Sequence, residues 1–303
     1  MEHSKPVLVV GATGFLGMEI CRLLAASNKT VKALVRQSSD PEKVKALENL
    51  GIETVTGDIK DRRSLDQAFR DVEKVISTAS STLSKVTGDS IETVDHLGQL
   101  NVIDAAQKAG VKKFVFISFP ESHVQFPLQD AKRSAEDVLI KSGMDYTILR
   151  PTFFMEIWLG PYLGFDIRNR KATVYGHGVN KVSWISLKDV ARFAVQSLDN
   201  DRTTNKILEL GGPEALSPLD VIKLAENADG HSFELQYVPE EIINNQKNNS
   251  ENPLEQSFSA LMLTLAAGTE IDMVEVLKIM PVQLISVDEY IREVVSEQVE
   301  HAL

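Results

Sequence analysis

The chain of 303 residues has little of several features that mark particular classes of protein. It has one cysteine, Cys21, so no disulfide can form within it, and the apolar pattern around Cys21 favours a buried packing residue over a reactive thiol. No apolar run approaches the ~20 residues that a membrane-spanning helix needs. The N-terminal residues contain no apolar region of the signal-peptide type, so we expect a cytoplasmic protein.

Positive charge is also scarce, with 32 lysines and arginines against 43 acidic residues and a formal net charge of −11. Nucleic acids and anionic membranes both reward a basic surface, so we expect neither as a main partner. No G-x-S-x-G turn occurs, and the scattered histidines lack the spacing of metal ligands. A small-molecule substrate is the expected partner, and a protein partner remains open.

The first half of the chain alternates apolar runs of strand length with helical patterns. We expect strands at 6–10, 31–36, 52–58, 74–80, 113–118 and 145–150. Helices are expected to begin near Gly11, Pro41, Ser64, Ser90 and Gln129, and the fourth of them ends at Gly110. Strands that are apolar throughout are buried on both faces, which indicates an α/β fold with a doubly wound parallel sheet.

The composition changes after Pro151, where glycine, proline and aromatic residues gather in PTFFMEIWLGPYLGF. We therefore expect one domain at 1–151 and a smaller α+β lobe for substrate or partner at 152–303, with some segments returning to the sheet. Within this lobe, Ser217 and Pro218 mark a helix start, and the polar stretch 244–253 is expected to be an exposed loop. Open α/β sheets bind ligands at the carboxyl ends of their strands, which such a lobe would cover.

The stretch GATGFLG follows the first strand directly and places Gly11, Gly14 and Gly17 where the first helix begins. Gly11 permits a tight turn, Gly14 permits the backbone to approach a phosphate, and Gly17 permits close packing of helix on strand. The helix N-terminus would offer free N–H groups to a pyrophosphate. This order predicts a Rossmann-type NAD(P)-binding domain, although a glycine turn without a ligand has the same local pattern.

The end of the second predicted strand bears on the choice between NAD and NADP. NAD-selective sites usually place an acid about twenty residues beyond the glycines, on the ribose 2′-hydroxyl. Arg36 stands there instead, and the nearest acid is Asp40. A guanidinium suits the 2′-phosphate because it is a rigid bidentate donor. Arg36 therefore predicts NADP(H) rather than NAD(H), the alternative being a solvent-exposed arginine.

Several motifs in their order along the chain carry a resemblance to a known family: the glycine loop, ALVR at 33–36, GDIKD at 57–61, ISTAS at 76–80 and LRPTFFME at 149–156. Together they resemble the NmrA-like family of atypical short-chain dehydrogenases/reductases, near the isoflavone reductase-like enzymes. The resemblance covers the Rossmann half well and the remainder loosely. Many relatives have an asparagine after the glutamate of the last motif, where this chain has Ile157.

The resemblance implies particular contacts with the cofactor. Asp58 and Ile59 would flank the adenine, residues 78–80 would line the cofactor after the fourth strand, and Phe154 and Met155 would lie near the nicotinamide. Ser118, at the end of the fifth strand, is either a further contact or a hydrogen-bonded strand terminus. The full set of predicted cofactor-binding residues is Gly11, Thr13, Gly14, Phe15, Leu16, Gly17, Arg36, Asp58, Ile59, Thr78, Ala79, Ser80, Ser118, Lys132, Phe154 and Met155.

Lys132 is the predicted catalytic residue. Ordinary short-chain dehydrogenases use Tyr-x-x-x-Lys, but Leu128 stands four residues before Lys132, and none of the five tyrosines is followed by lysine at that spacing. Isoflavone reductase-like enzymes keep a lysine here as the proposed acid/base, and NmrA-like sensors keep it as a cofactor ligand. An ordinary solvated lysine is the third interpretation.

Two functions fit these residues. The first is an NADPH-dependent oxidoreductase that transfers hydride to a small conjugated, quinone-like or carbonyl substrate, with Lys132 or water supplying the proton. The aromatic residues Phe119, Phe153, Phe154, Trp158 and Tyr162 suit such a substrate, and they also suit ordinary packing. The second is a non-catalytic NADP(H)-binding redox sensor that acts through a protein partner, which the missing tyrosine favours.

Overall fold

The computed structural model describes residues 5–300, with side chains through residue 296. Within it the chain forms two compact units. Unit 1 contains the residues up to Ser118, Pro127–Arg150 and Val190–Leu208. Unit 2 contains Phe119–Phe126, Pro151–Asp189 and the residues from Glu209 onward. No helix within the described range is both long and apolar enough to cross a bilayer.

The larger sheet lies mostly in unit 1, and its strands run in the order β3-β2-β1-β4-β5-β6-β9. All the neighbouring pairs from β3 to β6 are parallel, with Val10 in β1 opposite Leu34 in β2 and Ser77 in β4. Short, fully buried apolar strands such as VLVV explain this parallel pairing. The strands are β1 Val7–Val10, β2 Val31–Val35, β3 Glu53–Thr56, β4 Lys74–Ser77, β5 Lys113–Ile117, β6 Asp145–Pro151 and β9 Lys206–Leu210. The predicted doubly wound α/β sheet is confirmed.

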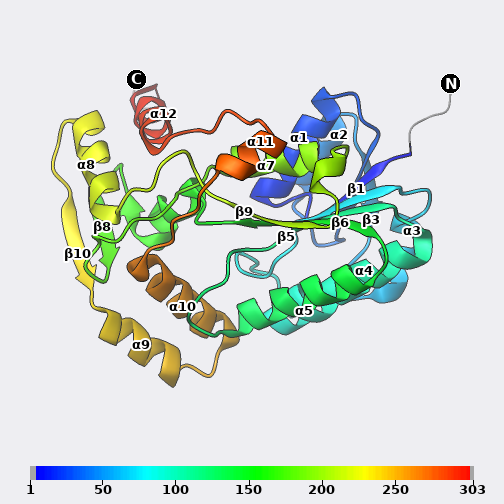
Figure 1. Ribbon diagram of the computed structural model, residues 1–303, viewed down its shortest axis with the longest axis horizontal. Helices are drawn as coiled ribbons and strands as arrows, with labels where there is room; N and C mark the ends of the chain where they lie inside the picture. Colours follow the sequence, from blue (N-terminus) through cyan, green and yellow to red (C-terminus); the bar gives the residue numbers. More distant parts are fainter. Residues whose placement is uncertain (1–4, 301–303) are drawn as a thin grey trace. The chain divides into compact units, whose positions relative to one another are not determined.

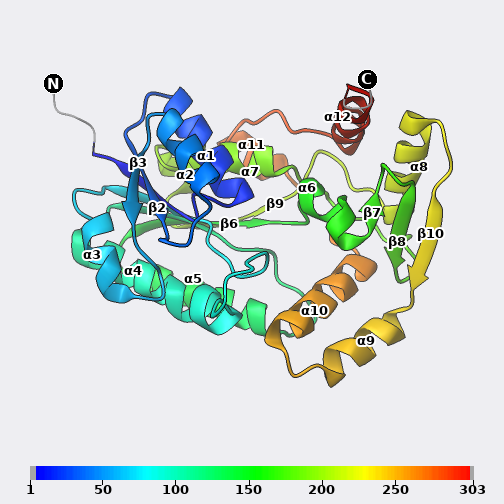
Figure 2. The ribbon, with the colours of Figure 1, turned by 180° about the vertical axis from the view of Figure 1, so that it is seen from behind.

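Helices cover both faces of this sheet, with α1 and α2 on one face and α3, α4 and α5 on the other (Figures 1 and 2). A π-helical segment, η2, leads directly into α4, which ends at the left-handed Gly110 as expected. The helical segments are α1 Phe15–Ala26, α2 Pro41–Asn49, η1 Arg62–Ser64, α3 Leu65–Ala68, η2 Ile91–His96, α4 Leu97–Ala109, α5 Pro127–Lys141, α7 Leu187–Ser197 and η4 Asp201–Thr203. Of these, α7 begins in unit 2 and continues into unit 1.

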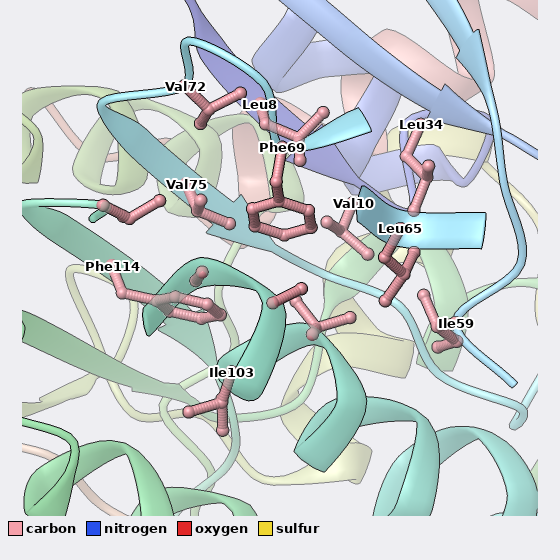
Figure 3. Close-up of a cluster of buried hydrophobic side chains, with 14 of the residues drawn as sticks. Leu8, Val10, Leu34, Ile59, Leu65, Phe69, Val72, Val75, Ile103 and Phe114 are labelled. Carbon is pink, nitrogen blue, oxygen red and sulfur yellow. The ribbon is translucent and has the colours of Figure 1, made fainter. Parts of the chain in front are cut away.

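The core of unit 1 lies between the sheet and the helices α3 and α4 (Figure 3). Phe69 and Phe114 are almost wholly buried there beside Leu8 and Ile103, and each such side chain contributes ~1.5–3 kcal/mol of hydrophobic stabilisation. On the opposite face, α1 buries Cys21 completely, and this burial raises the pKa of its thiol to about 12. Cys21 is therefore the packing residue that its apolar surroundings predict.

Unit 2 contains a three-stranded sheet of order β10-β8-β7, in which β10 is parallel and β7 antiparallel to β8. Its strands are β7 Phe165–Asp166, β8 Lys171–Tyr175 and β10 Glu234–Val238. Its helices are α6 Met155–Trp158, η3 Pro161–Leu163, α8 Pro218–Asp229, α9 Glu240–Asn249, α10 Pro253–Ala267, α11 Val274–Ile279 and α12 Val287–Glu300. α8 begins at Ser217 with a complete capping box, as the Ser-Pro pair predicts.

One local expectation is wrong. The polar stretch 244–253 is not a loop, because α9 extends through Asn249 and α10 begins at Pro253. Ile243 is the only buried residue of α9, and residues 244–249 contain no apolar residue, so this part of the helix has the composition of a loop. Ser64 is the N-cap residue of α3, so this helix begins where the sequence predicts, although its Oγ accepts a hydrogen bond from Asp58 N rather than from the helix.

Candidate functional site

The glycine loop of unit 1 lies against the end of the fourth strand. Gly11 has a left-handed backbone with φ of +85°, and a Cβ there would lie 2.6 Å from Thr78 Oγ1 and 2.8 Å from Ala79 N. Only glycine combines this dihedral with this close approach. The sequence therefore brings the loop and residues 78–79 together at the carboxyl edge of the sheet, where ligands of such sheets bind.

Gly17 is the position in the loop that tolerates a side chain least. A Cβ at Gly17 would lie 2.1 Å from Gly11 O, whereas a Cβ at Gly14 would lie 3.3 Å from the same oxygen. We expect Gly17→Ala to lower the free energy of unfolding by about 2–3 kcal/mol and Gly14→Ala to lower it by less than about 1 kcal/mol. Urea denaturation followed by circular dichroism measures both variants. Equal losses would contradict the packing role of Gly17.

The N-terminus of α1 is open to an anion. Its N-cap is Gly14, which provides no side-chain cap, and its first turn contains no acidic residue. Thr13 and Leu16 are half-buried, and Phe15 is 62% exposed, with Lys43 Nζ 5.6 Å from its ring centroid. The unsatisfied N–H groups and the helix dipole together favour a phosphate here.

The predicted residues after β4 are held by α4. Thr78 N donates to Val10 O at 2.9 Å, and the buried Gln99 donates to Ala79 O at 2.8 Å while accepting from Ser77 Oγ at 2.8 Å. Thr78, Ala79 and Ser80 are each half-buried, so one side of this segment remains open to a ligand.

Asp58 and Ile59, the predicted neighbours of the adenine, follow β3. Asp58 Oδ1 accepts from Lys60 N at 2.9 Å, so the carboxylate closes its own turn. The Ile59 side chain is buried, and its carbonyl accepts from Asn101 Nδ2 at 2.8 Å. These contacts fix the segment beside α4, but its role at the adenine stays a prediction.

Arg36 follows β2 directly and is partly buried by an ion pair that the sequence did not suggest. Its Nη1 donates to Asp89 Oδ2 at 2.5 Å. Lys60 Nζ donates to the other oxygen, Asp89 Oδ1, at 2.6 Å. A guanidinium and an ammonium therefore converge on one carboxylate beside β2 and β3.

Lys132 lies in α5 and is only 5% exposed, which rules out an ordinary solvated lysine. Its Nζ is 3.5 Å from Asp95 Oδ1 and 5.1 Å from the centroid of the Phe116 ring. Asp95 is wholly buried in η2, and its Oδ2 accepts from Ser81 N at 2.9 Å and Ser81 Oγ at 2.6 Å. Among the described residues, Asp95 Oδ1 has no hydrogen-bond partner. The ammonium of Lys132 is therefore the positive charge that balances this buried carboxylate.

Ser118 lies just past β5 and is buried. Its N–H donates to Leu149 O at 2.8 Å, and its Oγ accepts from Arg133 Nη1 at 3.2 Å. Arg133 also pairs with Glu136 at 2.6 Å, so its charge is compensated within α5. These bonds describe a satisfied strand terminus, and a contact between Ser118 and the cofactor stays a prediction.

Phe154 and Met155 belong to unit 2. Phe154 is the N-cap residue of α6, and Met155 is wholly buried in the apolar core of that unit. Phe153 packs edge to face on Trp158 with ring centroids 4.8 Å apart, whereas Tyr162 is 84% exposed. Phe153 and Trp158 therefore pack in the hydrophobic core of unit 2. The contacts of Phe154 and Met155 with the nicotinamide stay predictions.

Four residues that the sequence analysis missed lie beside the predicted ones: Lys60, Ser81, Asp89 and Asp95. One signal for Asp95 was available, because Ile91, Asp95 and Gly98 are spaced by four and three residues on the buried face of a helical segment. An acid on such a face needs a buried partner. No cluster of three or more metal-ligating side chains occurs in the described part of the chain.

The model of the NmrA-like family matches residues 3–291, which is nearly the whole chain. This chain belongs to the NmrA-like family. That assignment confirms the resemblance seen in the glycine loop and the strand-end motifs. It also confirms that the segment beyond Pro151 is part of the family's fold, where the sequence motifs matched only loosely.

Three relatives bear on what NmrA-like proteins do. The photosystem II assembly factor Ycf39 of Synechocystis is 34% identical over 240 residues, 78% of this chain and 72% of that protein. The NAD(P)H azoreductase of Xenophilus azovorans is 33% identical over 226 residues, 74% of each. The solved structure of AtPrR2 with NADP+ and (+)pinoresinol has a TM-score of 0.74 at 25% identity and covers 97% of this chain and 99% of its own.

Proposed function

We propose that this protein is an NADPH-dependent reductase of a small conjugated, quinone-like or carbonyl substrate. The observation that carries the proposal is the buried pair of Lys132 and Asp95. Lys132 contacts Phe116 in β5, and Asp95 binds Ser81, four residues beyond β4. The amine of Lys132, which can carry a proton, is thus held near the carboxyl ends of β4 and β5. Rossmann-type sheets bind nicotinamide cofactors at that edge.

The residues of the chain would bind and orient the cofactor. The α1 N-terminus and Gly14 would hold the pyrophosphate, residues 78–80 would lie along the cofactor, and Arg36 would select the 2′-phosphate. When bound, NADPH supplies the hydride. Lys132 Nζ would hold a ribose hydroxyl or give a proton to the reduced substrate. Asp95 would hold the ammonium in one position, because a buried charge without a partner is costly.

The relatives support a reductase in two ways. The azoreductase uses NAD(P)H, and its match covers about three quarters of both chains. AtPrR2 has been solved with NADP+ and (+)pinoresinol. The predicted cofactor NADP(H) agrees with that structure.

A second function is a non-catalytic NADP(H)-binding protein that acts through a protein partner. The missing Tyr-x-x-x-Lys and the similarity to the assembly factor Ycf39 favour it. A sensor requires different affinities for the two redox forms of the cofactor. A reductase requires turnover, so the two functions are separable by experiment.

The test is oxidation of NADPH by the purified full-length protein with a panel of quinones, enones, aldehydes and azo dyes, followed by loss of reduced-nicotinamide absorbance. We expect saturable turnover with at least one conjugated acceptor and weaker binding of NADH than of NADPH. Micromolar binding of NADPH without turnover on any acceptor would favour the sensor. Absence of NADPH binding would refute both functions.

A further inference from the structure

Asp89 lies against Arg36, the residue predicted to bind the 2′-phosphate of NADPH. Its side chain is 3% exposed and accepts hydrogen bonds from three donors: Arg36 Nη1 at 2.5 Å, Lys60 Nζ at 2.6 Å and Ser84 Oγ at 2.5 Å. Arg36 follows β2 and Lys60 follows β3, so the two cations come from adjacent strands and meet at one anion. Two cations and a hydroxyl around an oxyanion make a set of donors that also suits phosphate.

The position of Asp89 is fixed by its own segment of chain. Asp89 N donates to Val86 O at 3.1 Å, and Gly88 has a left-handed backbone with φ of +85°. Gly88 O accepts from Thr93 Oγ1 at 2.9 Å, and Ser90 caps the following helical segment. The carboxylate is therefore placed by the start of η2 and is not a freely moving surface acid.

The three donors also keep Asp89 ionised. Burial opposes ionisation, but the hydrogen bonds from Lys60, Ser84 and Arg36 outweigh it and lower the pKa of Asp89 to about 2. The anion is therefore present throughout the neutral range. A second carboxylate, Asp58, lies 3.7 Å from Lys60 Nζ and adds to the negative charge around this ammonium.

We propose that Arg36 and Lys60 together form the 2′-phosphate site, and that Asp89 determines its specificity by competing with the phosphate for both cations. The 2′-hydroxyl of NADH carries no charge, so the Asp89 carboxylate has almost no effect on the binding of NADH. The 2′-phosphate carries between one and two negative charges near neutral pH and meets an anion already on the two cations. This inference rests on the proposed function, because it presumes that the chain binds NADPH.

The competing possibility is that Asp89 helps the phosphate by orienting Arg36. The geometry favours competition, because Asp89 contacts Lys60 as well as Arg36 and so engages both cations rather than one edge of one guanidinium. Removing a unit negative charge within ~8 Å of a bound phosphate changes its binding constant by roughly tenfold or more. The loss of one orienting hydrogen bond has the opposite sign and a smaller size.

The experiment measures binding of adenosine 2′,5′-bisphosphate and of AMP to the full-length protein by calorimetry. Asp89→Asn is expected to raise the affinity for the bisphosphate by roughly tenfold or more and to change the affinity for AMP by less than about twofold. Lys60→Met and Arg36→Met are each expected to lower the affinity for the bisphosphate but not the affinity for AMP. Asp104→Asn is the matched control, because Asp104 is a carboxylate of the same unit bound by Arg62 and Lys108.

The outcomes separate the inference from the proposed function. An unchanged or weaker affinity of Asp89→Asn for the bisphosphate overturns the inference, and so does an equal gain in Asp104→Asn, which would reflect net charge alone. If Asp89→Asn does not fold, Asp89→Ser decides, since it removes the same negative charge from Arg36 and Lys60 and should give a gain of the same sign. If the wild type does not bind NADPH, the proposed function fails first.

Discussion

Replacing Lys132 by methionine is expected to lower kcat for NADPH oxidation by about 10²–10⁴-fold, the usual contribution of a positioned general acid. Methionine keeps the length and the apolar contact with Phe116 but carries no proton and no charge. If Lys132 instead serves only as a ligand of the ribose, the main effect falls on the affinity for NADPH. Single-turnover kinetics at saturating NADPH, together with a direct titration of NADPH binding, measures the two effects separately.

Lys132→Arg distinguishes a proton donor from a fixed charge. Arginine stays protonated in proteins, so it can replace an ammonium that binds hydroxyls but not one that transfers a proton. We expect Lys132→Arg to be as slow as Lys132→Met. The control is Lys141→Met, an exposed lysine in the last turn of the same helix. Restoration of kcat by arginine would leave Lys132 as a cofactor ligand alone.

Six strands of the main sheet were predictable because most of them are short apolar runs followed by a turn signal. β9 was not predicted, since it lies outside the alternating half and only two of its five residues are buried. The glycine loop was predictable because Gly11 and Gly17 meet steric demands that only glycine satisfies. The C-terminal part of α9 was not predictable in the same way, since residues 244–249 contain no apolar residue and the one buried residue of the helix, Ile243, lies before them.

The ion pairs of the site could not be predicted from local sequence. Lys132 was singled out by its place in a motif, but its partner Asp95 lies in another helical segment and meets it only through the packing of α5 on η2. Asp89 and Arg36 are likewise distant in the sequence and come together across the edge of the sheet. Charges in polar stretches look solvated until the tertiary structure assigns their neighbours.

Asp95→Asn is expected to lower the free energy of unfolding by about 3–5 kcal/mol, the usual cost of removing one partner of a buried ion pair. Asparagine would keep one acceptor for Ser81 but would leave the ammonium of Lys132 buried without its anion. The exposed control Asp104→Asn removes the same charge from paired cations of the same unit, and its cost should be less than about 1 kcal/mol.

Both tryptophans, Trp158 and Trp184, belong to unit 2, so the stability of unit 1 should be followed by hydrogen exchange of the β4 and β5 amides rather than by tryptophan fluorescence. The double variant Asp95→Asn/Lys132→Met completes a cycle. Because it removes both charges, we expect it to cost less than the sum of the single variants by at least about 2 kcal/mol. Additive losses in the free energy of unfolding would mean that the charges of Asp95 and Lys132 do not stabilise each other. Asp95 would then not be the residue that holds the amine in place for the reaction.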